Sequence, residues 1–229
     1  MSGDVHVRIC ERLGVRLPRA TRLVAGFEHE DDARRFLADL RERLEKFALA
    51  LHPDKTRLIE FGRHAAVARR KRGLGKPETF NFLGFTHICA RARSGRFVLK
   101  RKTRRDRLHA KLKALKAELR RRMHDSIPEQ GKWLAQVVRG YFAYHAVPTN
   151  SRALDAFHHH VKTLWWRTLR RRSQKDRSSW ALIVRCAADF LPKPRILHPW
   201  PDTRFLVNHP RWEPSARIGP ARFCAGGAQ

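Results

Sequence analysis

The chain has 229 residues, of which 50 are Lys or Arg and 21 are Asp or Glu, so its formal net charge is +29. Hydrophobic residues make up 42% of the chain, which excludes a wholly disordered basic tail. A compact domain with this charge repels itself unless a polyanion neutralises it, and nucleic acid is the commonest polyanion. Free use of Arg in a GC-rich genome is the alternative that composition leaves open.

The cysteines and the apolar runs exclude other classes. Cys10, Cys89, Cys186 and Cys224 form no C-x-x-C pair, which argues against a zinc ribbon, and scattered cysteines are typical of reduced thiols. No apolar run approaches the roughly 20 residues of a membrane span, and the amino terminus has no signal-peptide core. We therefore expect a cytoplasmic protein that does not bind a membrane.

The amino-terminal half alternates helix and strand signals. Residues 1–22 show no clean period and stay unassigned. Apolar residues then recur at helical spacing from Asp31, a candidate N-cap, until His52-Pro53-Asp54 ends the helix. The sequence predicts a strand over 56–61 and a basic loop over 62–77. Two further strands, 80–88 and 96–100, form a predicted hairpin around Ser94-Gly95.

Beyond Lys100 the pattern is helical. Apolar stripes predict helices over 103–123 and about 129–145, and Asn150 is a candidate cap for a third helix. A fourth helix, about 179–190, follows a predicted cap at Ser178-Ser179, and the tail from Pro192 has no regular pattern. We interpret the stripes as core packing. The fold class is α+β: a helix, a strand and a hairpin, followed by a mainly α-helical part.

The basic helix faces favour an anionic partner. Between Arg101 and Asp125 there are eleven Lys or Arg and three acids. A merely solvated face usually mixes signs, so this helix repels itself without a partner.

Five segments in order resemble one family. They are GFEHEDDARRFLADL (26–40), LALHPDKTRLIEFG (49–62), FNFLGF (80–85), VVRGYFAYHAVPTNSRALDAF (137–157) with LRRRSQKDR (169–177), and a tail with ILHPWPDTRF and HPRWEPSARIG. Together they resemble group II intron reverse transcriptase/maturases of the compact bacterial type without an endonuclease domain.

The resemblance implies a right-hand fold, in which a palm copies RNA into DNA and a thumb with the maturase region clamps intron RNA. It divides the chain into an unassigned segment 1–22, a partial palm 23–100, a thumb and maturase-specific domain 101–191, and a tail 192–229.

One departure from the family concerns catalysis. Members carry Tyr-Ala-Asp-Asp just before the GFE segment, and the alignment puts its two aspartates at Thr21 and Arg22. Phosphoryl transfer needs carboxylates that hold two Mg²⁺ ions, which Thr and Arg cannot do. We therefore expect no catalytic residue, no cofactor where the full-length family uses Mg²⁺, and a truncated remnant of a mobile element. Lys55 is the remnant of a palm lysine.

The resemblance also assigns residues to RNA. Phe82, Leu83, Gly84 and Phe85 resemble the primer grip, with ordinary sheet packing as the alternative for the two phenylalanines. Tyr141 is more often a core residue than a stacking platform. The candidate RNA-binding residues are Arg104, Arg105, Lys111, Lys113, Arg139, Tyr144, Arg170, Arg171, Arg172 and Lys175.

No metal site is expected. His158, His159 and His160 are consecutive, and consecutive residues of a helix point about 100° apart, so they cannot easily share one ion. No G-x-S-x-G or paired Cys–His signature indicates nucleophilic catalysis either.

We predict an RNA-binding maturase-type fragment that assists the folding and splicing of structured RNA, in particular group II intron RNA, without making DNA alone. The alternative is part of an active RNA-directed DNA polymerase whose palm is encoded upstream. A DNA-binding helical protein is a third reading, but no helix-turn-helix or zinc finger supports it.

Overall fold

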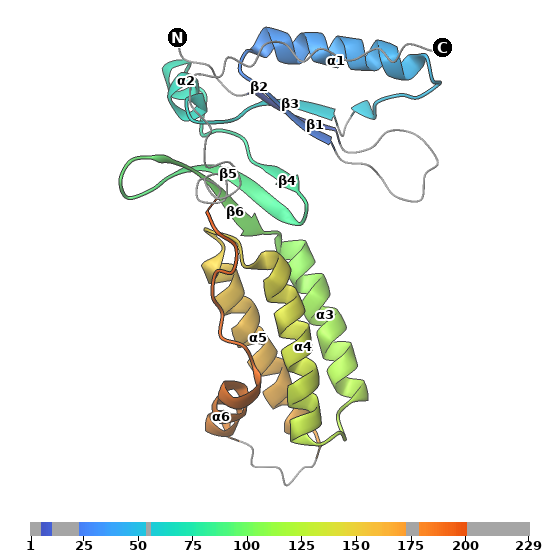
Figure 1. Ribbon diagram of the computed structural model, residues 1–229, viewed down its shortest axis with the longest axis vertical. Helices are drawn as coiled ribbons and strands as arrows, with labels where there is room; N and C mark the ends of the chain where they lie inside the picture. Colours follow the sequence, from blue (N-terminus) through green and yellow to red (C-terminus); the bar gives the residue numbers. More distant parts are fainter. Residues whose placement is uncertain (1–5, 11–22, 54–55, 173–178, 201–229) are drawn as a thin grey trace, which may run out of the picture.

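The computed structural model describes residues 6–10, 23–53, 56–172 and 179–200, and its fold is mixed α+β, as predicted. A part built on two small sheets lies above a bundle of long helices (Figure 1). The elements are β1 His6–Cys10, β2 Leu23–Phe27, α1 Glu30–Glu45, β3 Thr56–Glu60, α2 Ala65–Lys71, β4 Phe80–Phe82, β5 Phe85–Arg91, β6 Phe97–Thr103, α3 Arg105–Arg121, α4 Ile127–His145, α5 Ser151–Leu169 and α6 Trp180–Phe190.

The first sheet has the strand order β2-β1-β3, and β1 pairs antiparallel with both neighbours. The sequence assigns no element to residues 1–22, but residues 6–10 form the central strand of this sheet. Five residues carry too short a pattern to be recognised alone, because pairing with two partners decides whether they form a strand. The rest of residues 1–22, including Thr21 and Arg22, lies outside the described residues.

Helix α1 packs on β1 and β2 (Figure 1). Ala33 and Leu44 are its buried residues. The prediction of Asp31 as N-cap is wrong, because the helix begins earlier, after His29, and Asp31 lies in an acidic first turn. Acids in a first turn complement the positive end of the helix dipole.

A short helix, α2, lies within the segment 62–77, for which the sequence predicts a basic loop. Three of its seven residues are Ala and three are Arg or Lys, all strong helix formers. Arg69 and Arg72 pair with Glu60 of β3, which ties α2 to the first sheet. The loop prediction is therefore wrong at 65–71, since seven residues are too few to display a helical period.

The second sheet, β4-β5-β6, is an antiparallel meander, and its predicted turn around Ser94-Gly95 is confirmed. The single strand predicted over 80–88 is wrong. The chain reverses at Leu83 and Gly84, whose φ angles are 45° and 77°. Two successive positive φ values match the type I′ hairpin turn, and Leu83 hides this turn from sequence analysis because leucine rarely adopts positive φ.

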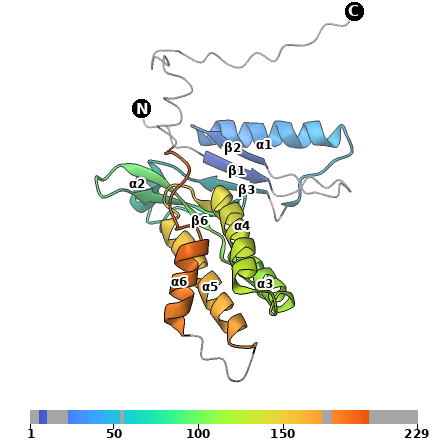
Figure 2. The same cartoon turned by 60° about the horizontal axis from the view of Figure 1, so that its bottom comes forward.

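Helices α3, α4 and α5 form an up-and-down bundle, and α6 packs on α4 and α5 (Figures 1 and 2). The predicted apolar stripes are core packing, as expected. The largest fully buried side chains of this core are Leu119, Leu134, Val138, Leu154, Phe157, Val161, Trp165, Leu169 and Ile183.

Local capping sets where two helices begin. Ser126 and Glu129 form a capping box, in which the Glu129 carboxylate accepts from the Ser126 backbone N–H at 2.9 Å. Helix α4 therefore starts at Ile127, two residues before the predicted start. The Ser179 side chain caps α6, as predicted.

Asn150 joins the second sheet to the bundle. It precedes α5, as predicted, but its side chain makes no capping bond. Its Oδ1 accepts from the Thr103 backbone N–H at 3.0 Å, and its Nδ2 donates to Thr103 Oγ1 and to the His145 carbonyl, both at 2.8 Å. The residue is 2% exposed, so water does not compete for these bonds, which hold β6 against the α4–α5 connection.

The end of α4 is covered by the segment that follows α6. Residues 191–200 run back along the bundle without regular structure, as predicted for the tail (Figure 1). The backbone N–H groups of Leu197 and His198 donate to the Ala146 carbonyl at 3.0 and 3.2 Å, which satisfies a helix-end acceptor. Residues 201–229 of the predicted tail lie outside the described residues.

Strand β6 continues to Thr103, so it crosses the predicted domain boundary between residues 100 and 101 and leads directly into α3.

Within the described ranges, no helix has the length and apolar character needed to cross a bilayer.

Candidate nucleic-acid interface

A groove runs between α3 and α4 next to the turn between β4 and β5, which we call the hairpin tip. This α3–α4 groove has a volume of about 360 Å³. Its lining residues are Arg107, Lys111, Gln136, Val137, Gly140, Tyr141, Tyr144 and His145.

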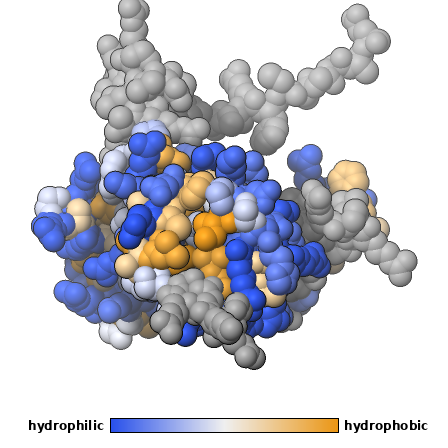
Figure 3. All heavy atoms as spheres, turned by 90° about the horizontal axis from the view of Figure 1, so that it is seen from below, coloured by the Kyte–Doolittle hydropathy of each residue, from blue (hydrophilic) through white to orange (hydrophobic). Residues whose placement is uncertain are grey.

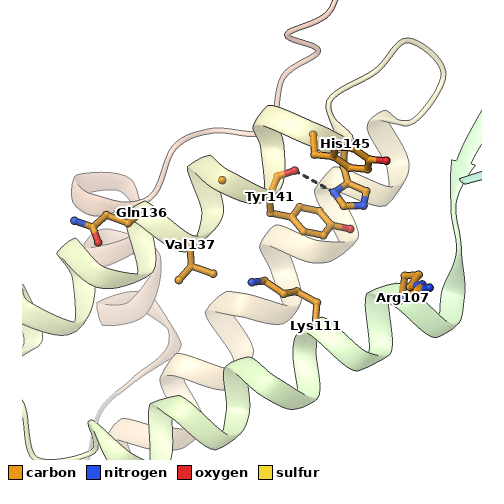
Figure 4. A pocket seen from close by; sticks show the side chains of 8 residues that line it. Arg107, Lys111, Gln136, Val137, Tyr141 and His145 are labelled. Atoms are coloured by element: carbon orange, nitrogen blue, oxygen red, sulfur yellow. Dashed lines mark hydrogen bonds between the residues drawn. The ribbon is translucent and has the colours of Figure 1, made fainter. Parts of the chain in front are cut away.

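The cations of the groove come from α3. Arg107 and Lys111 are four residues apart, which puts them on one face of the helix. Both are exposed, and Lys111 extends from α3 toward α4 (Figure 4). The lining contains no acid, and neither cation forms an ion pair with an acid in the described ranges. The lining of the groove therefore carries two positive charges and no acidic residue.

The opposite wall is aromatic. Tyr144 is 50% exposed, so one side of its ring is open to a ligand. Tyr141 is buried between His145, at 4.1 Å between ring centroids, and Phe157, at 3.6 Å. Gly140 leaves open space, because a Cβ built there would meet nothing within 4 Å. The wall thus offers an aromatic ring beside a gap.

The hairpin tip holds the Tyr144 ring in place. The Tyr144 hydroxyl donates to the Leu83 carbonyl at 2.7 Å, and its ring stacks on Phe85 at 5.6 Å. The Gly84 carbonyl accepts from the Arg104 backbone N–H at 3.1 Å. Leu83 has a positive φ angle, which strains its backbone, and its apolar side chain is 58% exposed beside the groove.

Burial shifts the pKa values of Tyr141 and His145 on the aromatic wall in the directions that favour their neutral forms. Burial lowers the pKa of His145 below its usual value of 6.5, and its ring Nδ1 lies 3.1 Å from the Tyr141 carbonyl (Figure 4). Burial raises the pKa of Tyr141 to about 12. The charge of the groove at neutral pH therefore comes from Arg107 and Lys111.

The predicted primer-grip residues all lie at or next to the hairpin tip. Phe82 packs on the small core of Ile59 and its neighbours, and Phe85 is buried against α4. Leu83 and Gly84 form the turn itself. The two phenylalanines thus pack within the protein, and the exposed surface of the tip comes from Leu83.

The predicted RNA-binding residues near α3 and α4 have three kinds of surroundings. Lys111 and Tyr144 line the α3–α4 groove. Arg104 pairs with Asp106 through two contacts of 3.0 and 2.7 Å. The remaining three, Arg105, Lys113 and Arg139, are exposed but do not line the groove.

The predicted cluster at 170–172 diverges in space. Arg170 lies over the Trp166 ring at 5.2 Å, and Arg171 lines a second groove between α3 and α5. Arg172 donates to the Asp125 carbonyl and so ties the end of α5 to the α3–α4 connection. These three neighbours in sequence therefore have three different surroundings, at the turn that follows the last residue of α5.

Two predicted residues, Lys55 and Lys175, lie outside the described residues. Sequence analysis missed Arg107, Gln136 and His145 as groove residues. Their signal is the spacing: Arg107 is four residues before Lys111, and His145 is four after Tyr141.

A comparison with protein-family models and with curated proteins finds no match for this chain.

Proposed function

We propose that this protein binds RNA through the α3–α4 groove. The observation that carries the proposal is the combination of two cations, which form no ion pair within the described residues, with an exposed tyrosine ring fixed by the hairpin tip. Cations suit backbone phosphates, and an open aromatic face suits an unpaired base. The groove thus matches the two chemical groups of a single-stranded nucleotide.

The resemblance to group II intron maturases extends this proposal to a biological role. In that family the protein helps the intron RNA fold and splice, and the partner proposed here is accordingly a structured RNA such as a group II intron. The support for this step is the order of the five resembling segments.

The net charge of +29 will attract any polyanion, so the test must compare variants with equal charge. The groove variant is Arg107→Gln with Lys111→Gln. The control is Arg139→Gln with Lys113→Gln, which removes the same charge from exposed positions of α4 and α3 that do not line the groove. Binding is measured by fluorescence anisotropy on an RNA stem with an unpaired loop, from low to moderate salt.

We expect the groove variant to lose more affinity than the control. Its log–log salt slope should fall by about 1.4, roughly 0.7 for each lost contact to a single strand. Equal losses in the two variants would mean that binding is generic polyanion attraction, and the proposed interface would be wrong.

A further inference from the structure

A second basic groove lies between α3 and α5, with a volume of about 80 Å³, and we call it the distal groove. Its cations are Lys116 and Arg120 of α3, Arg167 of α5, and Arg171, which lies two residues past the end of α5. Lys116 and Arg120 are four residues apart in α3, so they share a face about 6 Å apart along the axis. Two short rows of positive charge therefore face one another across this groove.

These cations lack the pairing seen elsewhere in the molecule. Near α1 and β3, Arg69 and Arg72 pair with Glu60. Glu118, an acid of α3, pairs with Arg122 at 3.0 Å. The distal groove has no acid in its lining, and within the described residues none of its four cations pairs with one. Four like charges that converge without a counter-charge favour a ligand with several negative charges.

The distal groove and the α3–α4 groove lie on different sides of α3. Lys111 and Lys116 are five residues apart, a rotation of about 140° around the helix. The buried residues Leu115 and Leu119 face the bundle core between the two directions. A single short strand in one groove therefore does not reach the other.

The lower end of the bundle carries both hydrophilic and apolar surface. Seen from below the bundle, hydrophilic residues enclose a smaller apolar area (Figure 3). Arg171 continues the basic character past the end of α5, since it follows the last helical residue, Leu169, by two positions.

We infer that the distal groove is a second phosphate-binding site, which holds neighbouring phosphates of an RNA backbone while another part of the same RNA occupies the α3–α4 groove. The inference rests on the proposed function for the identity of the ligand. It specifies that the RNA is folded, so that it presents backbone on two sides of α3. A competing explanation is that these cations stabilise the fold, because cations near the carboxyl ends of α3 and α5 also complement the helix dipoles.

Lysine footprinting on the whole, unmodified chain tests the inference. An amine-reactive acetylating reagent labels exposed lysines with and without a folded RNA, and mass spectrometry measures each site. Lys116 reports on the distal groove and Lys111 on the α3–α4 groove. Lys132 and Lys193 are exposed controls that line neither groove. We expect several-fold protection of Lys116 and Lys111 and little change at the controls.

The possible results distinguish the distal phosphate-binding site from the proposed α3–α4 interface. Protection of Lys111 without Lys116 overturns the distal site and leaves the proposed function intact. Protection of Lys116 without Lys111 supports the distal site and refutes the α3–α4 interface. Equal protection of all four lysines overturns the inference, because it indicates a diffuse contact. Labelling of free protein confirms that each lysine reacts before RNA is added.

A variant pair excludes a purely structural role. Lys116→Gln with Arg167→Gln should lower the salt slope for folded RNA by up to about 1.8, roughly 0.9 for each lost duplex contact. Arg152→Gln with Arg185→Gln is the matched control, since both residues are exposed and lie outside the two grooves. A distal variant that binds RNA like the control, or that differs from it only in melting temperature, overturns the inference.

Discussion

Replacing Asn150 with Ala removes the side chain that joins the second sheet to the bundle. Three hydrogen bonds disappear, and their partners are the Thr103 N–H, the Thr103 hydroxyl and the His145 carbonyl. Thr103 is 5% exposed, so its N–H finds no water in exchange. An orphaned buried donor costs about 1–3 kcal/mol, and each of the other two bonds contributes about 0.5–1.5 kcal/mol.

We therefore expect Asn150→Ala to lower the free energy of unfolding by about 4 kcal/mol, with a range of about 2–6. For a chain of this length the melting temperature should fall by about 8–16 °C. Helix content should stay near that of the unchanged protein, because no helix core residue is removed. Circular dichroism during thermal and urea unfolding measures both quantities.

Asn81→Ala is the matched control. Asn81 is exposed, and its Oδ1 accepts one bond from the Thr86 hydroxyl at 2.7 Å. An exposed substitution of this kind changes stability by about 0.5 kcal/mol or less. If the two Asn→Ala variants have the same stability, the Asn150 network does not hold the sheet against the bundle, and the reasoning is refuted.

Three further predictions concern packing, protonation and activity. Gly131→Ala should destabilise the fold by about 1–3 kcal/mol in a urea titration, because the new Cβ would lie 2.5 Å from the Phe190 ring. Gly140→Ala is the control: its Cβ would meet open space, so the substitution should be neutral or stabilising. The free energy of unfolding should fall as the pH drops below about 6.5, because burial lowers the pKa of His145 and the unfolded chain then binds a proton that the folded chain does not. His145→Gln should reduce this pH dependence in unfolding experiments, and an unchanged pH profile would contradict the prediction. The purified chain should not extend a primer on an RNA template with Mg²⁺ or Mn²⁺ while it retains RNA binding, and extension above a mock-purified control would contradict the absence of a two-metal site.

The amphipathic helices could be predicted with little more than spacing. The stripes over 103–123 and 129–145 predicted α3 and α4 because a period of three to four residues repeats over several turns. Ser179 was recognised as a cap because its capping bond is local, made to a backbone N–H three residues later. Long and locally encoded elements are those that sequence alone specifies.

Short or strained elements were missed for a physical reason. Strand β1 depends on two partner strands, and α2 has only seven residues. The turn at Leu83 and Gly84 uses a positive φ that leucine seldom adopts, and Tyr144, 61 residues later in the chain, donates a hydrogen bond to the Leu83 carbonyl. In these places nonlocal contacts decide the backbone conformation.

The sequence by itself determined the basic character of the chain, the α+β class and the apolar faces of its main helices. Tertiary structure alone decided which cations lie together. Arg170, Arg171 and Arg172 are consecutive yet have separate surroundings, whereas Lys116 and Arg167 come from different helices yet line one groove. The chain turns after Leu169 and sends the three arginines to different neighbours, and only the packing of α3 against α5 brings distant cations together.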